Sequence, residues 1–226
     1  MAVSEPEFLR ATRASYDTMA VDYADWIREE LTVKPLDRGM LAGFADLVRA
    51  TDVGPVADIG CGPGRVTAHL HGLGLSAFGV DLSPQMVAVA RQAHPGLRFD
   101  VGSMLALGLA DGSLGGIVAW YSIIHVPQER LPEAFAEFHR VLAPGGHLLL
   151  AFQVGDEVSH RTEALGRPVS LDFHRRQPAS VAELLNQTRL VIRAQLVREP
   201  DDYGDFPEKT QQAFLLARKP TDADRP

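Results

Sequence analysis

The chain has 226 residues, 46% of them hydrophobic and 23% charged, which suits one globular domain with a buried core and excludes a disordered or fibrous chain. Its net charge of −7 comes without a basic stripe, so no nucleic-acid partner is expected. No apolar run approaches the roughly 20 residues of a membrane span, and the first residues lack the pattern of a signal peptide. The lone cysteine, Cys61, rules out an internal disulfide and fits a reducing compartment. We therefore expect a cytoplasmic protein without a membrane partner.

Two amphipathic helices are predicted before the first strand. Apolar and aromatic residues between Leu9 and Ile27 recur at helical spacing, and Tyr16 and Tyr23 belong to this pattern. A second helix is predicted over residues 36–48. Its buried face is expected to hold Leu36, Met40, Phe44 and Leu47. Together these helices predict a helical cap at the N-terminus.

The stretch VADIGCGPG, residues 56–64, predicts a buried strand followed by a tight turn. Gly60, Gly62 and Gly64 occupy alternate positions, and glycine is needed where the backbone takes positive φ or must let a ligand approach. A helix predicted from Arg65 onward points its free N–H groups back at this turn. Strand, turn and helix together indicate the nucleotide-binding crevice of an open α/β sheet.

The crevice departs from the dinucleotide-binding pattern G-x-G-x-x-G. Arg65 stands where the third glycine is required, and Asp58 precedes the first glycine, where it repels a pyrophosphate. A carboxylate at that place suits a ligand ammonium. Asp81 ends the next predicted strand, about 20 positions after the first glycine, where an acid accepts both hydroxyls of a ribose. The two acids describe S-adenosylmethionine better than NAD.

Strands and helices alternate over the next seventy residues. Ser83 is the predicted N-cap of a helix with Pro84 at its first position. Strands are predicted over residues 97–101, 116–120 and 147–152, and a helix over residues 129–142 with Leu142 facing inward. Gly145 and Gly146 are expected to form a tight turn before the last of these strands.

Three motifs in this order resemble the class I S-adenosylmethionine-dependent methyltransferases, within them the compact, metal-independent branch that acts on small molecules. They are DIGCGPG (residues 58–64), GVDLSPQM (79–86) and RVLAPGGHLLL (140–150). The resemblance implies a doubly wound α/β fold with a mostly parallel seven-stranded sheet, the last strand antiparallel. We expect one domain, residues 1–226: a helical cap (1–50), a cofactor-binding core (51–152), and a substrate-wall segment with the closing strands (153–226).

The resemblance also implies a set of cofactor-binding residues. Tyr16 and Tyr23 are expected near the methionine carboxylate, with the simpler alternative that both rings belong to the core. Met86 is expected either against the adenine or in the core, and Ser103 replaces the acidic residue that usually meets the adenine amino group. The predicted cofactor-binding residues are Tyr16, Tyr23, Asp58, Gly60, Cys61, Gly62, Asp81, Leu82, Met86, Gly102, Ser103, Met104 and Trp120.

His125 is the candidate catalytic residue. It follows the strand predicted over residues 116–120, on the edge where open sheets bind ligands, and imidazole can accept a proton near neutral pH. Tyr121 lies beside it in the sequence. The alternative is a hydrogen-bonded structural histidine. Residues 117–128 contain no acidic side chain, so no metal site is expected there.

The last third of the chain is polar at first and ends in strands. Residues 153–178 are predicted either as part of the substrate wall, with Phe173, His174 and an arginine at the pocket, or as a solvated surface segment with a short strand. A helix over 180–188 and strands over 190–197 and 212–218 follow. The acidic loop between those strands is expected to border the pocket.

These features predict transfer of a methyl group from S-adenosylmethionine to an O, N or C nucleophile of a small molecule, with a secondary metabolite as the favoured guess. The product of the cofactor is S-adenosylhomocysteine. Two alternatives are an NAD(P)-linked oxidoreductase and a non-catalytic, cofactor-binding scaffold. The oligomeric state is left open.

Overall fold

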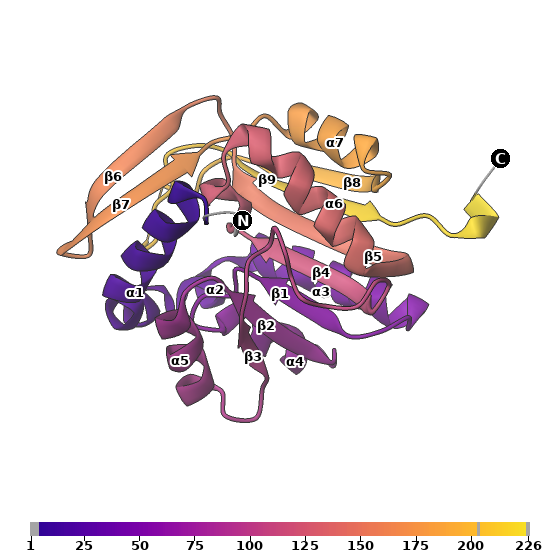
Figure 1. Cartoon of the computed structure of the whole chain (residues 1–226), viewed down its shortest axis with the longest axis horizontal. Helices are drawn as coiled ribbons and strands as arrows, with labels where there is room; N and C mark the ends of the chain where they lie inside the picture. Colours follow the sequence, from indigo (N-terminus) through magenta and orange to yellow (C-terminus); the bar gives the residue numbers. More distant parts are fainter. Residues whose placement is uncertain (1–4, 203, 225–226) are drawn as a thin grey trace.

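Seven strands form one mixed sheet in the order β3-β2-β1-β4-β5-β9-β8, and a computed structural model describes residues 5–202 and 204–224 (Figure 1). The strands are β1 (Val56–Ile59), β2 (Ala77–Asp81), β3 (Phe99–Val101), β4 (Leu114–Trp120), β5 (Leu142–Gln153), β8 (Val191–Arg198) and β9 (Gln212–Arg218). Strands β1 to β5 pair in parallel, and β9 is antiparallel to both β5 and β8. The predicted doubly wound, mostly parallel seven-stranded sheet is confirmed.

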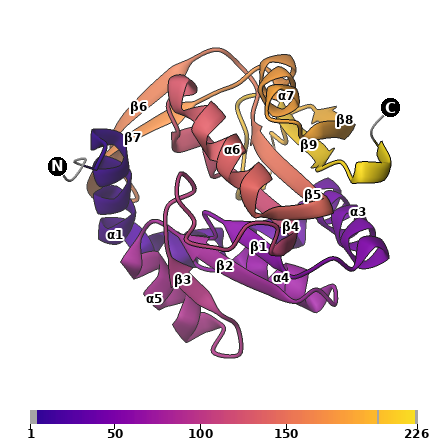
Figure 2. The same cartoon turned by 45° about the vertical axis from the view of Figure 1, so that its right-hand side comes forward.

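Helices cover both faces of this sheet (Figure 2). They are α1 (Glu7–Ile27), α2 (Glu30–Val33), α3 (Pro35–Thr51), α4 (Arg65–Gly72), α5 (Pro84–Ala93), α6 (Leu131–Val141) and α7 (Pro178–Gln187), with short 3-10 turns η1 (Ile123–His125), η2 (Gln128–Arg130) and η3 (Asp222–Asp224). Phe135 and Phe138 of α6 join the buried cluster on one face, together with α7. Phe44 of α3 and Leu70 of α4 join the cluster on the other face.

The buried face of α3 differs from the predicted one. Leu36 and Leu47 are 56% and 39% exposed. The buried stripe of α3 consists of Asp37, Leu41, Phe44, Ala45 and Val48. The prediction was right for Phe44 and wrong for Leu36 and Leu47, because Asp37 takes the place of an apolar residue in the buried stripe through its ion pair with Arg198 at 3.1 Å.

Strand β5 begins earlier than predicted. Leu142 was expected in the preceding helix, but α6 ends at Val141 and Leu142 already pairs with Leu114 of β4. Residues 144–146 therefore lie inside β5, where the pairing with β4 shifts between Leu114 and Gly116. Gly145, at φ +85°, allows this irregularity because its backbone is left-handed.

A hairpin outside the main sheet follows β5. Strands β6 (Val158–Ala164) and β7 (Arg167–His174) form a separate two-stranded sheet, which lies beside α1 (Figure 1). Ser15 of α1 fastens it, since its hydroxyl accepts from the Ser170 N–H at 2.9 Å and lies within 3.2 Å of the Ser170 carbonyl. Within the described residues, no helix is both long and apolar enough to cross a membrane.

Candidate functional site

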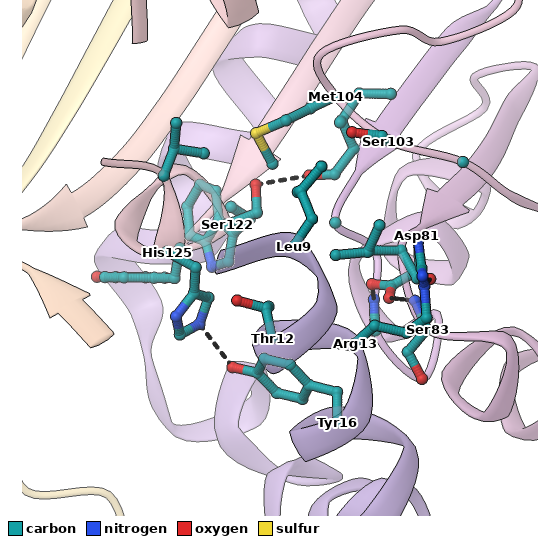
Figure 3. Close-up of a pocket in the computed structure, with 18 of the residues that line it drawn as sticks. Leu9, Thr12, Arg13, Tyr16, Asp81, Ser83, Ser103, Met104, Ser122 and His125 are labelled. Carbon is teal, nitrogen blue, oxygen red and sulfur yellow. Dashed lines mark hydrogen bonds between the residues drawn. The ribbon is translucent and has the colours of Figure 1, made fainter. Parts of the chain in front are cut away.

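A cavity of about 850 Å³, counted with its open mouth, lies at the carboxyl ends of the central strands beneath α1 (Figure 3). Its described lining consists of Phe8, Leu9, Thr12, Arg13, Tyr16, Tyr23, Ile59, Gly60, Gly62, Arg65, Asp81, Leu82, Ser83, Gly102, Ser103, Met104, Trp120, Tyr121, Ser122, His125 and Val126. The cavity therefore joins the glycine turn with the candidate catalytic residues His125 and Tyr121.

The glycine turn has the conformation that its sequence predicts. Gly60 and Gly62 lie at φ +75° and +53°, where glycine is favoured. A Cβ atom on Gly60 would lie 2.3 Å from Cβ of Ser122, so the two chain segments touch at this point. Ser122 is held there by its hydroxyl, which donates to the Ile59 carbonyl at 2.6 Å. Only glycine fits between β1 and the loop after β4.

Asp81 is fixed on the cavity wall by backbone groups. Its Oδ2 accepts the Gly62 N–H at 2.7 Å, and its Oδ1 accepts the Ser83 N–H at 2.8 Å. Burial raises the pKa of Asp81 to about 6, against the lowering effect of these two donors. Each carboxylate oxygen can accept a second hydrogen bond, as the predicted ribose contact requires.

Asp58 is fully buried and is absent from the described lining of the cavity. Its Oδ2 accepts the Thr67 hydroxyl at 2.7 Å, whereas Oδ1 has no partner among residues 5–202 and 204–224. Burial raises the pKa of Asp58 to about 7. The structure thus leaves a buried acceptor free behind the glycine turn, and a direct contact of Asp58 with a ligand stays a prediction.

Two other predicted cofactor residues lie away from the cavity wall that the structure describes. Cys61 packs with Val87, Ala90 and Phe99, because Gly79 leaves room for its sulfur. Met86 is 1% exposed on the buried face of α5. Of the two roles expected for Met86, the structure supports the core.

His125 is held by two hydrogen bonds. Its Nδ1 lies 2.8 Å from the carbonyl oxygen of Asp172 in β7, and its Nε2 lies 2.7 Å from the hydroxyl of Tyr16 (Figure 3). A carbonyl only accepts, so Nδ1 carries the proton, Nε2 is the acceptor, and Tyr16 donates. Burial lowers the pKa of His125 to about 4, so the ring is neutral near pH 7. His125 therefore has the hydrogen bonds expected of a structural histidine, and it also lines the cavity, as a catalytic base must.

Helix α1 forms the roof of the cavity and is fastened to the loop after β2. Arg13 donates to the Leu82 carbonyl at 3.3 Å. Asp17 accepts from the Ser83 hydroxyl and, at 3.1 Å, from the Gln85 N–H. These contacts place Tyr16 over the site.

Comparison with known proteins agrees with this geometry. A family model described as a methyltransferase domain matches residues 56–146, from β1 into β5. Demethylmenaquinone methyltransferase of Chlorobaculum parvum is 35% identical over 92 residues, which are 40% of this chain and 37% of that protein. O-methyltransferase cnsE of Penicillium expansum is 32% identical over 119 residues, 50% of this chain and 42% of that protein. The matches thus span less than half the length of these two relatives.

Solved structures share the fold over nearly the whole chain. Magnesium protoporphyrin IX methyltransferase of Synechocystis PCC 6803 with bound S-adenosylmethionine aligns with a TM-score of 0.69 at 16% identity, covering 96% of this chain and all of that one. The 1,6-didemethyltoxoflavin N1-methyltransferase of Burkholderia thailandensis aligns with a TM-score of 0.67 at 18% identity, covering 98% and 93%. Residues 56–146 thus match the methyltransferase-domain family model, and the solved methyltransferases share the fold. These findings agree with the predicted resemblance to the class I S-adenosylmethionine-dependent methyltransferases and with S-adenosylmethionine as the cofactor.

Sequence reasoning missed part of the cavity of this methyltransferase domain. The missed lining residues are Phe8, Leu9, Thr12, Arg13, Ile59, Arg65, Ser83, Ser122 and Val126. Leu9 and Thr12 precede Tyr16 by two turns and one turn of α1, so helical periodicity would have found them. Arg65 was noted only as a departure from the dinucleotide pattern.

The predicted substrate-wall segment reaches the candidate site indirectly. Phe173 and His174 are not part of the described cavity lining, although the Phe173 ring packs 4.7 Å from the His125 ring. Arg176 is buried and donates to the carbonyls of Ile123 and Val126, so it supports the loop that carries His125. The acidic loop before β9 contacts the buried amine of Lys34 through Asp201 and Glu208 rather than lining the cavity that the structure describes.

The described part of the chain contains no group of three or more His, Cys, Asp or Glu side chains arranged to hold a metal ion. The site consists of a glycine turn, a fixed carboxylate, a tyrosine–histidine pair and an apolar roof. Such an arrangement can bind a nucleoside and can accept a proton from a neighbouring ligand.

Proposed function

We propose that this chain is a methyltransferase that transfers a methyl group from S-adenosylmethionine to a nucleophilic atom of a small molecule. The observation that carries the proposal is that one cavity of a methyltransferase domain is lined by the glycine turn with Asp81 and by the Tyr16–His125 pair. The first set of groups suits the cofactor, and the second suits the acceptor.

The residues present fit the cofactor. Asp81 offers two anchored carboxylate oxygens for the ribose, and Ser103 with Met104 lies at the end of β3, where the adenine is expected. The orphaned Oδ1 of Asp58 supplies negative charge behind the turn for a cationic ligand end. When bound, S-adenosylmethionine supplies an activated sulfonium methyl group, so the protein need only position the acceptor and exclude water.

The Tyr16–His125 pair provides a path for the proton of the acceptor. Tyr16 donates its own proton to Nε2 of His125, which leaves lone pairs on the phenol oxygen for an acceptor O–H or N–H. The proton that the acceptor atom loses on methylation would pass to the phenol oxygen of Tyr16 while the Tyr16 proton passes to Nε2 of His125, so that the pair ends with one added proton on the imidazole. The carbonyl of Asp172 then stabilises the imidazolium through Nδ1.

The names of the relatives support a small acceptor and leave its nucleophile open. The proteins matched include a demethylmenaquinone methyltransferase, an O-methyltransferase and a toxoflavin-precursor N-methyltransferase. The cavity has apolar walls at Phe8, Leu9 and Met104, which suit a partly apolar molecule. A secondary metabolite is the acceptor we propose, and the cytoplasm is the proposed location.

Calorimetric titration with S-adenosylmethionine, S-adenosylhomocysteine and NADH tests this proposal. Micromolar binding of the first two, on the order of −8 kcal/mol, without binding of NADH is the expected result. Binding of NADH alone would favour the oxidoreductase alternative. An acceptor screen that follows release of S-adenosylhomocysteine then separates an enzyme from a cofactor-binding scaffold, which would bind without turnover.

A further inference from the structure

Arg65 occupies the first position of α4, directly after the glycine turn, and its side chain lines the cavity. Its Nη2 forms an ion pair with Oε2 of Glu30 at 2.6 Å, and both side chains are largely buried, at 17% and 16% exposure. Its Nη1 is buried and has no hydrogen-bond partner in the part of the chain that the structure describes. The guanidinium is therefore ion-paired with Glu30, whose Oε2 also lacks a hydrogen-bond partner among the described residues, and its Nη1 is unsatisfied.

A buried guanidinium N–H without an acceptor is unfavourable, because the group has lost its water and gained nothing in return. Arginine presents its donors as a planar fork that matches a carboxylate. A ligand carboxylate at this wall of the cavity would supply the missing acceptor. The Glu30 contact fixes the guanidinium, so little side-chain freedom remains to be lost on binding.

The order of the strands indicates which end of the cofactor meets Arg65. Ser103 follows β3 and Asp81 ends β2, so the adenine and ribose are expected over these two strands. The methionine part of an extended ligand then lies over β1 and β4, next in the sheet. Arg65 follows β1 by way of the glycine turn, and Tyr23 lies close to Gly62 of that turn.

One of the two tyrosines predicted at the methionine carboxylate is already engaged. Tyr16 was predicted at that carboxylate, but its hydroxyl donates to Nε2 of His125. Asp58, whose buried Oδ1 has no partner among the described residues, belongs to β1, the strand that leads through the glycine turn to Arg65. A buried carboxylate and the guanidinium of Arg65 therefore lie on the two sides of one turn.

We propose that Arg65, held by Glu30, binds the α-carboxylate of the methionine part of S-adenosylmethionine and so makes the site selective for ligands with an intact amino-acid end. This inference rests on the proposed function. It makes Arg65 a binding residue, in addition to the residues that the motifs predicted.

Two ligands separate this role from a general effect on the fold. S-adenosylhomocysteine carries the amino-acid group, whereas 5′-methylthioadenosine keeps the adenine, ribose and sulfur without it. Both are titrated calorimetrically into the wild-type protein and into Arg65→Met, Arg65→Lys and Glu30→Gln. Arg49→Met, an exposed arginine of α3 paired with Asp46, is the matched control.

Arg65→Met is expected to weaken S-adenosylhomocysteine about 10- to 100-fold and 5′-methylthioadenosine less than about threefold, as the loss of a charged hydrogen bond predicts. Arg65→Lys should recover part of the affinity, because it keeps the charge and loses the fork. Glu30→Gln should weaken S-adenosylhomocysteine by less than Arg65→Met, and Arg49→Met should change neither ligand.

Equal weakening of both ligands in Arg65→Met would show a structural role and would overturn the inference, as would unchanged affinity for both. Failure of the wild-type protein to bind either ligand would instead overturn the proposed function. The two failures are therefore distinguishable in one series of titrations.

Discussion

The phenol of Tyr16 donates a hydrogen bond to Nε2 of His125 at 2.7 Å, although 109 positions separate the two residues. Tyr16 comes from the roof helix α1, and His125 comes from the turn after β4. The edge of the Tyr16 ring also packs on the imidazole, with centroids 5.3 Å apart. The contact joins the helical cap to the sheet and completes the acceptor side of the cavity only when α1 is in place.

This pair leads to a prediction for catalysis. His125→Ala should lower kcat by roughly 10²- to 10⁴-fold, the usual contribution of a positioned base, while the affinity for S-adenosylhomocysteine stays within about threefold. Tyr16→Phe should lower kcat about tenfold or more, since it removes one hydrogen bond of the proton path. Steady-state kinetics at saturating cofactor measures both effects.

Thr18→Ala is the control, because Thr18 lies on α1 outside the described lining of the cavity and its hydroxyl donates to the Ala14 carbonyl of the same helix. Its kcat should match that of the wild-type protein. Unchanged kcat in His125→Ala would remove His125 as the proton acceptor.

The pH dependence of kcat follows from the state of His125. Burial lowers its pKa to about 4, so the ring is already unprotonated and able to accept a proton at pH 6. At saturating cofactor, kcat should therefore be flat between pH 6 and pH 8 and should fall only as the pH drops below about 5. An inflection between pH 6 and pH 7 that disappears in His125→Ala would contradict this prediction.

Cofactor affinity should depend on pH where kcat does not. Burial raises the pKa of Asp81 to about 6 and that of Asp58 to about 7, so both carboxyls gain their negative charge between pH 5 and pH 8. S-adenosylmethionine carries a sulfonium and an ammonium, so its dissociation constant should decrease over this interval, by about tenfold. Calorimetry at pH 5, 6, 7 and 8 measures the change. The dependence should become shallower in Asp81→Asn, and a dependence of the opposite sign would contradict the prediction.

The sequence predicted those parts of the fold and site that depend on local pattern. Gly60 and Gly62 belong to one turn, Asp81 ends the next strand, and the place of all three at the cavity follows from the geometry of a strand–turn–helix unit. Ser83 is the N-cap of α5, as predicted, and accepts the Met86 N–H. Such features need no knowledge of distant contacts.

Other features depend on contacts between distant segments, which no local pattern contains. The buried position of Asp37 requires Arg198, and the hydroxyl of Tyr16 is committed to His125 by the docking of α1. The segment after β5 was predicted either as substrate wall or as surface. In the structure, the backbone carbonyl of Asp172 in this segment accepts a hydrogen bond from Nδ1 of His125 and so orients the ring. Arg65 could be assigned a role only after Glu30 was seen beside it.

Asp58 leads to a prediction for stability. Its pKa in the folded protein is raised from 3.8 to about 7, so the folded state binds a proton more tightly than the unfolded state. The resulting stabilisation is fully present below about pH 4 and is lost as the pH rises through 7. Asp58→Asn should therefore raise the melting temperature of the ligand-free protein more at pH 8 than at pH 5, by several degrees. Thermal unfolding at both pH values is the measurement, and an equal shift at both would contradict the raised pKa.

Gly60 provides a test of the contact between the glycine turn and the loop after β4. A Cβ atom at this position would lie 2.3 Å from Cβ of Ser122, and the backbone has φ +75°. Gly60→Ala should therefore lower the free energy of unfolding by roughly 2–5 kcal/mol, from backbone strain and overpacking together.

Gly43 of α3 is the control, because no atom of the described residues lies within 4 Å of a Cβ built there. Gly43→Ala should raise that free energy by about 0.5–1 kcal/mol. Urea unfolding measures both, and a Gly60→Ala protein as stable as the wild type would mean that Gly60 and Ser122 do not touch in this way.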